Sequence, residues 1–87
     1  MIQVIRTVED VQKFFRELRG EQLNFHPDDD FADYIDIDTR APIYTRAKAQ
    51  ARNKLLIQAF DVCETAGVDI YDLCIDVFQA DSIKTFQ

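Results

Sequence analysis

Glycine, proline and cysteine are all scarce in this chain, and each shortage removes a class of structure. Of the 87 residues only two are Gly and two are Pro, which excludes collagen-like, linker-like and turn-rich all-β chains. The two cysteines, Cys63 and Cys74, are too few for the disulfide framework of a small secreted domain. Their spacing matches neither a Cys-x-x-Cys motif nor a zinc site, and both fall on apolar helix faces. We therefore expect two free thiols in the core of a cytoplasmic protein.

Long apolar runs and an excess of positive charge are also missing. No run approaches the roughly 20 apolar residues that span a membrane, so we expect no membrane partner. Sixteen acids against ten Lys and Arg give a net charge of −6. This charge argues against a protein that binds nucleic acid by neutralising its phosphates. With 47% hydrophobic and 30% charged residues, the composition is typical of a folded protein, and the length predicts a single domain over residues 1–87.

Apolar residues recur at helical spacing over residues 8–19. The hydroxyl of Thr7 and the carboxylate of Asp10 supply the two halves of a capping box at the start of this helix. Gly20 predicts its end, in the left-handed conformation that glycine adopts readily. Ahead of the helix, residues 2–5 are β-branched enough for a short strand, but they suit an apolar tether equally well.

The same periodicity predicts two further helices, near residues 46–66 and 70–79. Thr45 and Asp69 are suited to cap their starts, and Gly67 to end the first of them. Residues 81–87 are compatible with one further, fraying turn, from which Ile83 and Phe86 are able to dock. The apolar faces of the three helices predict one buried cluster, made of Phe14, Phe15, Leu18, Leu55, Ala59, Phe60, Cys63, Leu73, Cys74 and Val77.

The segment between the first and second helices is rich in acids and has no clear period. Pro27 favours an extended His26, and the three aspartates that follow are suited to cap a helix. We expect one short helix flanked by irregular chain, while the alternation over residues 34–38 fits a short strand equally well. The predicted fold is therefore mainly α: a small three-helix domain with an irregular acidic segment between helices 1 and 2. The sequence leaves open whether this domain also contains one short strand or strand pair.

Charges of one sign are grouped along the chain. Residues 20–38 carry seven acids and no base, residues 39–60 five bases and no acid, and residues 61–81 six acids and no base. Lys48 and Arg52 lie on the apolar side of the second helix, so segment 28–38 folded over them would pair opposite charges. Two alternatives remain: Lys48 and Arg52 form a basic stripe that is left open to an acidic partner, or the grouped charges are simply solvated.

No motif identifies a catalytic centre, because a Gly-rich phosphate loop, a zinc motif and a nucleophile elbow are all missing from the sequence. We therefore expect no cofactor and a non-enzymatic protein–protein interaction module with an unidentified protein partner. Uncovered apolar residues and grouped charges supply the candidate partner-binding residues: Ile57, Tyr71, Ile75, Lys48, Arg52, Asp28, Asp29 and Asp30. The exposed position of Ile57 and the wide apolar arc of the third helix also predict weak homo-oligomerisation.

Two other functions remain open. An antitoxin-like inhibitor or nucleic-acid mimic would direct its acidic surface at a basic partner. A metal-dependent enzyme would combine His26 with the aspartates of segment 28–38, because carboxylates orient imidazole and bind divalent ions. That cluster nevertheless lacks the Gly and the closing Glu of an EF-hand loop.

Overall fold

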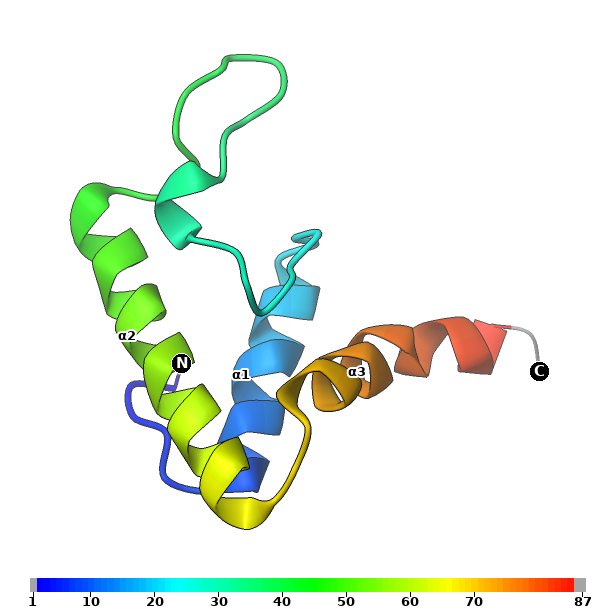
Figure 1. The fold of residues 1–87 in the computed structure, drawn as a ribbon. Coiled ribbons are helices and arrows are strands. Elements are labelled where there is room, and N and C mark those ends of the chain that lie inside the picture. The colour runs from blue at the N-terminus through cyan, green and yellow to red at the C-terminus, as the bar shows by residue number, and fades with distance from the viewer. Residues whose placement is uncertain (1, 86–87) are drawn as a thin grey trace.

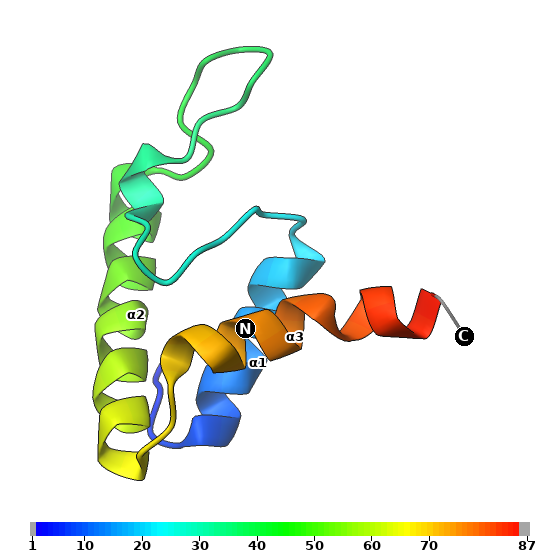
Figure 2. The same cartoon turned by 45° about the vertical axis from the view of Figure 1, so that its right-hand side comes forward.

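Three α-helices and one short 3₁₀ helix make up the computed structural model of this chain, which describes residues 2–85, with side chains through residue 79. In chain order they are α1 (Val8–Gly20), η1 (Phe31–Asp33), α2 (Arg46–Ala66) and α3 (Ile70–Thr85). α1 packs against both α2 and α3, and η1 packs on α2 (Figure 1). The turned view shows α3 crossing α1 and then running away from α2 (Figure 2). The prediction of a mainly α three-helix domain is confirmed.

The start of α1 is as predicted, but its end is not. Thr7 Oγ1 accepts a hydrogen bond from the Asp10 N–H at 3.2 Å, and the Asp10 carboxylate accepts one from the Thr7 N–H at 3.3 Å. The prediction of a left-handed Gly20 is wrong: Gly20 is the last helical residue, and Gln22 takes the left-handed conformation, with φ 61°. The N–H of Leu23 bonds back to the helix at 3.4 Å, and its side chain packs on the core. This core contact sets the position of the turn.

The other predicted helix boundaries agree with the structure, except the last. Thr45 Oγ1 accepts a hydrogen bond from the Lys48 N–H at 3.2 Å, and Gly67 is left-handed, with φ 70°. Asp69 Oδ1 accepts one from the Tyr71 N–H at 2.9 Å. α3 continues beyond the predicted end at residue 79 to Thr85. The expected docking of Ile83 and Phe86 falls on side chains outside those that the structure describes.

The described residues contain almost no β-structure. Residues 2–5 form a tether: the N–H of Ile5 donates to Gln58 Oε1 at 2.9 Å, and the Ile5 side chain is buried. The sequence leaves open a strand pair in the acidic segment. The structure has only one isolated antiparallel bridge there, between Ile35 and Pro42. The short helix predicted there is η1.

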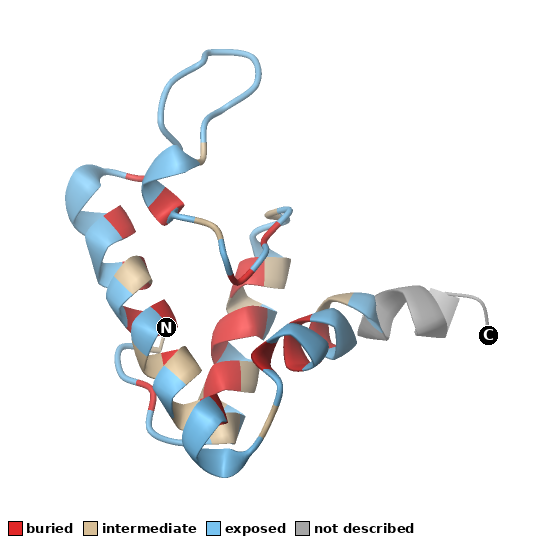
Figure 3. Cartoon of the chain, in the orientation of Figure 1, coloured by how far each residue is buried: buried red, intermediate tan, exposed pale blue. Residues whose placement is uncertain are grey.

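One hydrophobic cluster joins the helices, and it extends into the acidic segment (Figure 3). Nine of the ten predicted core residues are buried, whereas Phe60 is only partly buried and packs on the edge of the cluster. Phe31, which was not predicted to be in the core, is fully buried. Its ring centroid lies 5.5 Å from that of Phe25 and 6.2 Å from that of Phe14. The irregular segment is therefore held by aromatic packing.

Phe31→Ala should lower the free energy of unfolding by about 3–5 kcal/mol, because it removes a fully buried ring and leaves a cavity. The matched control Ile37→Ala, at a side chain that is 87% exposed, should change it by less than about 0.5 kcal/mol. Urea denaturation of the two variants and the parent checks the contrast. Equally small effects would show that residue 31 does not lie in the core.

Candidate functional site

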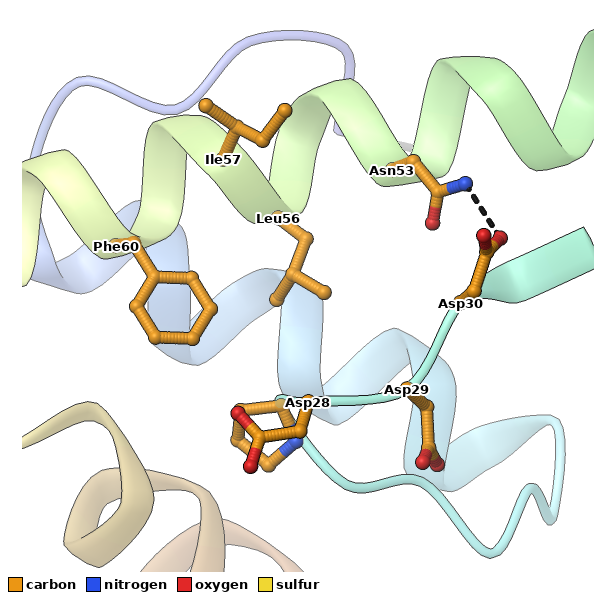
Figure 4. A pocket seen from close by; sticks show the side chains of 8 residues that line it. Asp28, Asp29, Asp30, Asn53, Leu56, Ile57 and Phe60 are labelled. Atoms are coloured by element: carbon orange, nitrogen blue, oxygen red, sulfur yellow. Dashed lines mark hydrogen bonds between the residues drawn. The ribbon is translucent and has the colours of Figure 1, made fainter.

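A groove with a volume of about 450 Å³ lies between α2 and the chain that precedes η1 (Figure 4). Its lining residues come from residues 27–30 on one side and from α2 on the other: Pro27, Asp28, Asp29, Asp30, Asn53, Leu56, Ile57 and Phe60. Four of the predicted partner-binding residues are among them, namely Ile57 and the three aspartates. The fold thus brings an exposed apolar side chain and an acidic cluster, far apart in the sequence, to one surface.

The acidic wall of the groove is a turn shaped by its own side chains. Asp29 Oδ2 accepts hydrogen bonds from the His26 N–H at 3.0 Å and from the Tyr34 hydroxyl at 2.7 Å. The Asp28 N–H donates to His26 Nδ1 at 3.1 Å. Asp29 consequently points away from α2 (Figure 4), and its role is to hold the turn. Burial, followed by the hydrogen bond to Asp29, raises the pKa of Tyr34, which stays protonated as the donor.

Asn53 fastens this turn to α2. Its Nδ2 donates to Asp30 Oδ1 at 2.8 Å, while its Oδ1 accepts a hydrogen bond from the Phe31 N–H at 3.0 Å. The hydrogen bond from the Ala32 N–H, and then the one from Asn53, hold the pKa of Asp30 below its ordinary value. Asn53 is not among the residues predicted from the sequence. Its signal in the sequence is that Asn, a weak helix former, stands in the middle of a long predicted helix.

Tyr71, from the start of α3, lies at the acidic turn next to Phe60. Its hydroxyl donates to Asp28 Oδ1 at 2.6 Å, and this hydrogen bond raises the pKa of Tyr71. The Tyr71 ring lies edge-on to Phe60, with centroids 6.1 Å apart, and its centroid is 5.7 Å from that of His26. Ile75 is half-exposed on α3 but does not line the groove. Tyr71 therefore joins the groove residues through Asp28, and Ile75 stands apart from them.

The two basic candidates, Lys48 and Arg52, lie elsewhere. Arg52 is only 3% exposed, and its guanidinium donates to both carboxylate oxygens of Glu21, at 3.0 and 2.6 Å. It also donates to the Tyr44 hydroxyl at 2.7 Å, which donates in turn to Glu21 at 3.1 Å. The predicted pairing of Arg52 with segment 28–38 is wrong, because Glu21, just after α1, reaches it instead. Lys48 is exposed, with its ammonium 5.5 Å from the Tyr44 ring centroid.

The Glu21–Arg52 ion pair is a structural feature rather than an open binding surface. Burial acts to raise the pKa of Glu21, but the hydrogen bond and charge of Arg52 outweigh it, and the net shift is downward. Burial raises the pKa of Tyr44 to about 12, so its hydroxyl remains a donor at neutral pH. Arg52, Glu21 and Tyr44 thus bond to one another at the edge of the core, while the buried Nε of Arg52 has no hydrogen-bond partner among the described residues.

Both predicted free thiols are present and buried. Burial raises the pKa of Cys63, and it raises that of Cys74 to about 11. The part of the chain that the structure describes contains no group of three or more His, Cys, Asp or Glu side chains that could hold a metal ion. None of the helices, over the same residues, has the length and apolar character needed to cross a membrane.

Glu21→Gln should lower the free energy of unfolding at pH 7 by at least about 1–2 kcal/mol, because the buried guanidinium loses its counter-charge and one of its two oxygen acceptors, which becomes an NH2 donor. The folded pKa of Glu21 lies below the ordinary 4.5. The stabilisation is therefore fully present above pH 4.5 and is lost as pH falls through the lower folded value. Urea denaturation across this pH range should show the difference between parent and variant shrinking as pH falls. The exposed control Glu64→Gln should shift stability by less than about 0.5 kcal/mol, and a pH-independent effect of Glu21→Gln would contradict the ion-pair account.

Comparison with known proteins finds no match: no protein-family model, no curated protein and no solved structure matches this chain. Its function is accordingly inferred from its own residues.

Proposed function

We propose that this chain is a non-enzymatic protein-interaction module whose groove binds a basic, apolar segment of a partner protein. The supporting observation is the position of Ile57, 64% exposed, in the same groove as the carboxylates of Asp28 and Asp30. In such a surface the apolar side chains supply contact area, and the charges select the partner and orient it.

The charge of the groove favours a basic occupant. Three acids and no base line it. Asp28 and Asp30 accept hydrogen bonds from neutral donors of the chain, which satisfy their oxygens without cancelling their charge. Along α2, Glu64 follows Phe60 by four residues and Lys54 precedes Ile57 by three, so the helix adds one charge of each sign near the groove and the aspartates decide its net charge. A Lys or Arg from a partner would meet an opposite charge here.

The apolar part of the groove favours a helical occupant. Leu56 and Phe60 form a strip on the side of α2 that faces the acidic turn, and Ile57 projects from another side of the helix (Figure 4). A partner helix laid beside such a strip contacts it with residues spaced three and four apart, the usual way in which an amphipathic helix occupies a groove. The antitoxin-like inhibitor and the nucleic-acid mimic are special cases of this proposal, because each would also use these carboxylates against a basic protein. Both remain predictions.

A synthetic amphipathic peptide of about four helical turns, with Leu along one face and Lys along the other, is a suitable probe. We expect the chain to bind it at least about tenfold more tightly than the matched peptide with Glu in place of Lys, because only the Lys peptide complements the carboxylates. Fluorescence anisotropy at constant ionic strength measures both affinities. Equal affinities for the two peptides would contradict the proposed selectivity.

Variants of the chain locate the binding surface. Ile57→Asn removes the exposed apolar contact, and Asp28→Asn removes a charge while keeping an oxygen for the Tyr71 hydroxyl. Each should weaken binding of the Leu/Lys peptide several-fold. Glu9→Gln makes a similar charge change on α1, outside the groove, and should leave binding unchanged. If Glu9→Gln weakens binding as much as Asp28→Asn does, net charge alone attracts the peptide and the groove is not the site.

A further inference from the structure

Residues 34–43, between η1 and α2, form an arm that projects from the helical body (Figures 1 and 2). Its two sides are joined by the bridge between Ile35 and Pro42. The Ile43 N–H donates to the Tyr34 carbonyl at 3.0 Å, and the Asp36 N–H donates to the Ala41 carbonyl at 2.8 Å. The arm therefore has a defined shape and lies clear of the groove-forming residues of α2.

Hydrogen bonds also order the tip of the arm. The Asp36 carboxylate accepts from the Asp38 N–H at 2.8 Å and from the Thr39 N–H at 3.1 Å. The Arg40 N–H donates to the Asp36 carbonyl at 2.8 Å, and Arg40 is left-handed, with φ 64°. At the base, the rings of Tyr34 and Tyr44 contact buried Phe31. An arm ordered at both ends has less conformational freedom to lose on binding.

Three isoleucines are exposed on this short arm. Ile35 and Ile43 are about half-exposed, and Ile37, at the tip, is 87% exposed. Single exposed apolar residues are ordinary features of protein surfaces, but a group of them on a projecting element marks a contact surface.

The charges of the arm determine which contact it suits. The tip carries two acids, Asp36 and Asp38, and one base, Arg40. The Asp36 carboxylate keeps its charge but is held in the turn by two backbone N–H groups. Asp38 and Arg40 are therefore the two charged side chains close to Ile37 in the sequence that are free to pair with a second copy. Neither has an ion-pair partner in the part of the chain that the structure describes. Because an acid and a base both lie close to Ile37 in the sequence, a two-fold contact through Ile37 allows Asp38 of each copy to meet Arg40 of the other. The groove, lined by acids alone, has no such property.

We infer that the arm mediates weak two-fold self-association of this chain. Ile37 of each copy packs against Ile37 of the other, and Asp38 of each copy pairs with Arg40 of the other. The contact is made by side chains, because Pro42 has no N–H for a strand ladder and an antiparallel ladder centred on Ile37 would place Asp36 opposite Asp38. The dissociation constant should be on the order of 0.1–1 mM, since two arm tips bury much less than the roughly 800 Å² per partner of a standard interface.

A dilution series of the full chain, followed by NMR of its isoleucine methyl groups, tests this inference. Between about 20 μM and about 1 mM, a range chosen for an affinity of this size, the methyl signals of the arm should shift with concentration, while those of Ile57 and Ile75 should not. Ile37→Ser should abolish the shifts, and the matched control Ile57→Ser should leave them unchanged. The absence of concentration-dependent shifts, shifts centred on Ile57 and Ile75, or persistence of the arm shifts in Ile37→Ser would each overturn it.

A charge swap tests the paired ions separately. Arg40→Asp should weaken association at least about threefold, because it places like charges opposite each other across the two-fold axis. Adding Asp38→Arg in the same chain restores opposite charges and should restore association. The Asp38 side chain accepts no hydrogen bond in the turn, so the swap leaves the shape of the tip intact. An unchanged urea midpoint confirms folding, and failure of the double variant to recover association would refute the ion pairing.

Discussion

The burial of one side chain, Phe31, positions both surfaces of this molecule. Between α1 and α2 the only helix is the single turn η1, so regular backbone hydrogen bonding alone does not hold the acidic segment in place. Phe31 is fully buried among aromatic rings, and Asn53 accepts a hydrogen bond from its N–H. The residues before Phe31 form the acidic wall of the groove, and the arm begins three residues after it. One apolar anchor thus gives a segment rich in charge a fixed orientation on α2.

The carboxylates near this anchor are satisfied mainly by neutral groups. Asp29 accepts from a backbone N–H and a tyrosine hydroxyl, Asp30 from Asn53 and a backbone N–H, and Asp36 from two backbone N–H groups. Neutral donors fill the oxygen lone pairs but leave the negative charge in place, so its field extends into solvent. Glu21 is different, because the buried cation Arg52 neutralises it. Glu21 therefore stabilises the fold through its charge, whereas Asp29, Asp30 and Asp36 hold the shape of the segment by hydrogen bonds and still keep the surface negative.

Features that depend on neighbours within about four residues could be predicted from the sequence. The Thr7 and Asp69 caps, the Gly67 turn and the exposure of Ile57 are of this kind, because a helix fixes which nearby residues meet. The Gln22 turn, the partner of Arg52 and the burial of Phe31 depend on contacts between distant segments. An irregular segment has no period that tells which side chain turns inward. The groove could not be predicted for the same reason: its acidic wall is placed by Phe31 and Asn53, not by local spacing.

The two surfaces differ in charge, and this difference limits how copies of the chain can meet. Exposed isoleucines on a projecting element are a risk for open-ended assembly, which arises when a surface binds a different surface on the next copy. The groove is an apolar surface that Ile37 could otherwise enter, but the carboxylates of Asp28 and Asp30 in its lining would repel Asp36 and Asp38 beside that isoleucine. Like charges oppose this head-to-tail contact, whereas the mixed charges of two arms favour a two-fold one. Because Pro42 has no N–H and the bridge is a single pair, the arm also offers no strand edge to which another copy could add a strand. On the proposed function, the acids of the groove would therefore act in two ways: they would select a basic partner and exclude the chain's own arm.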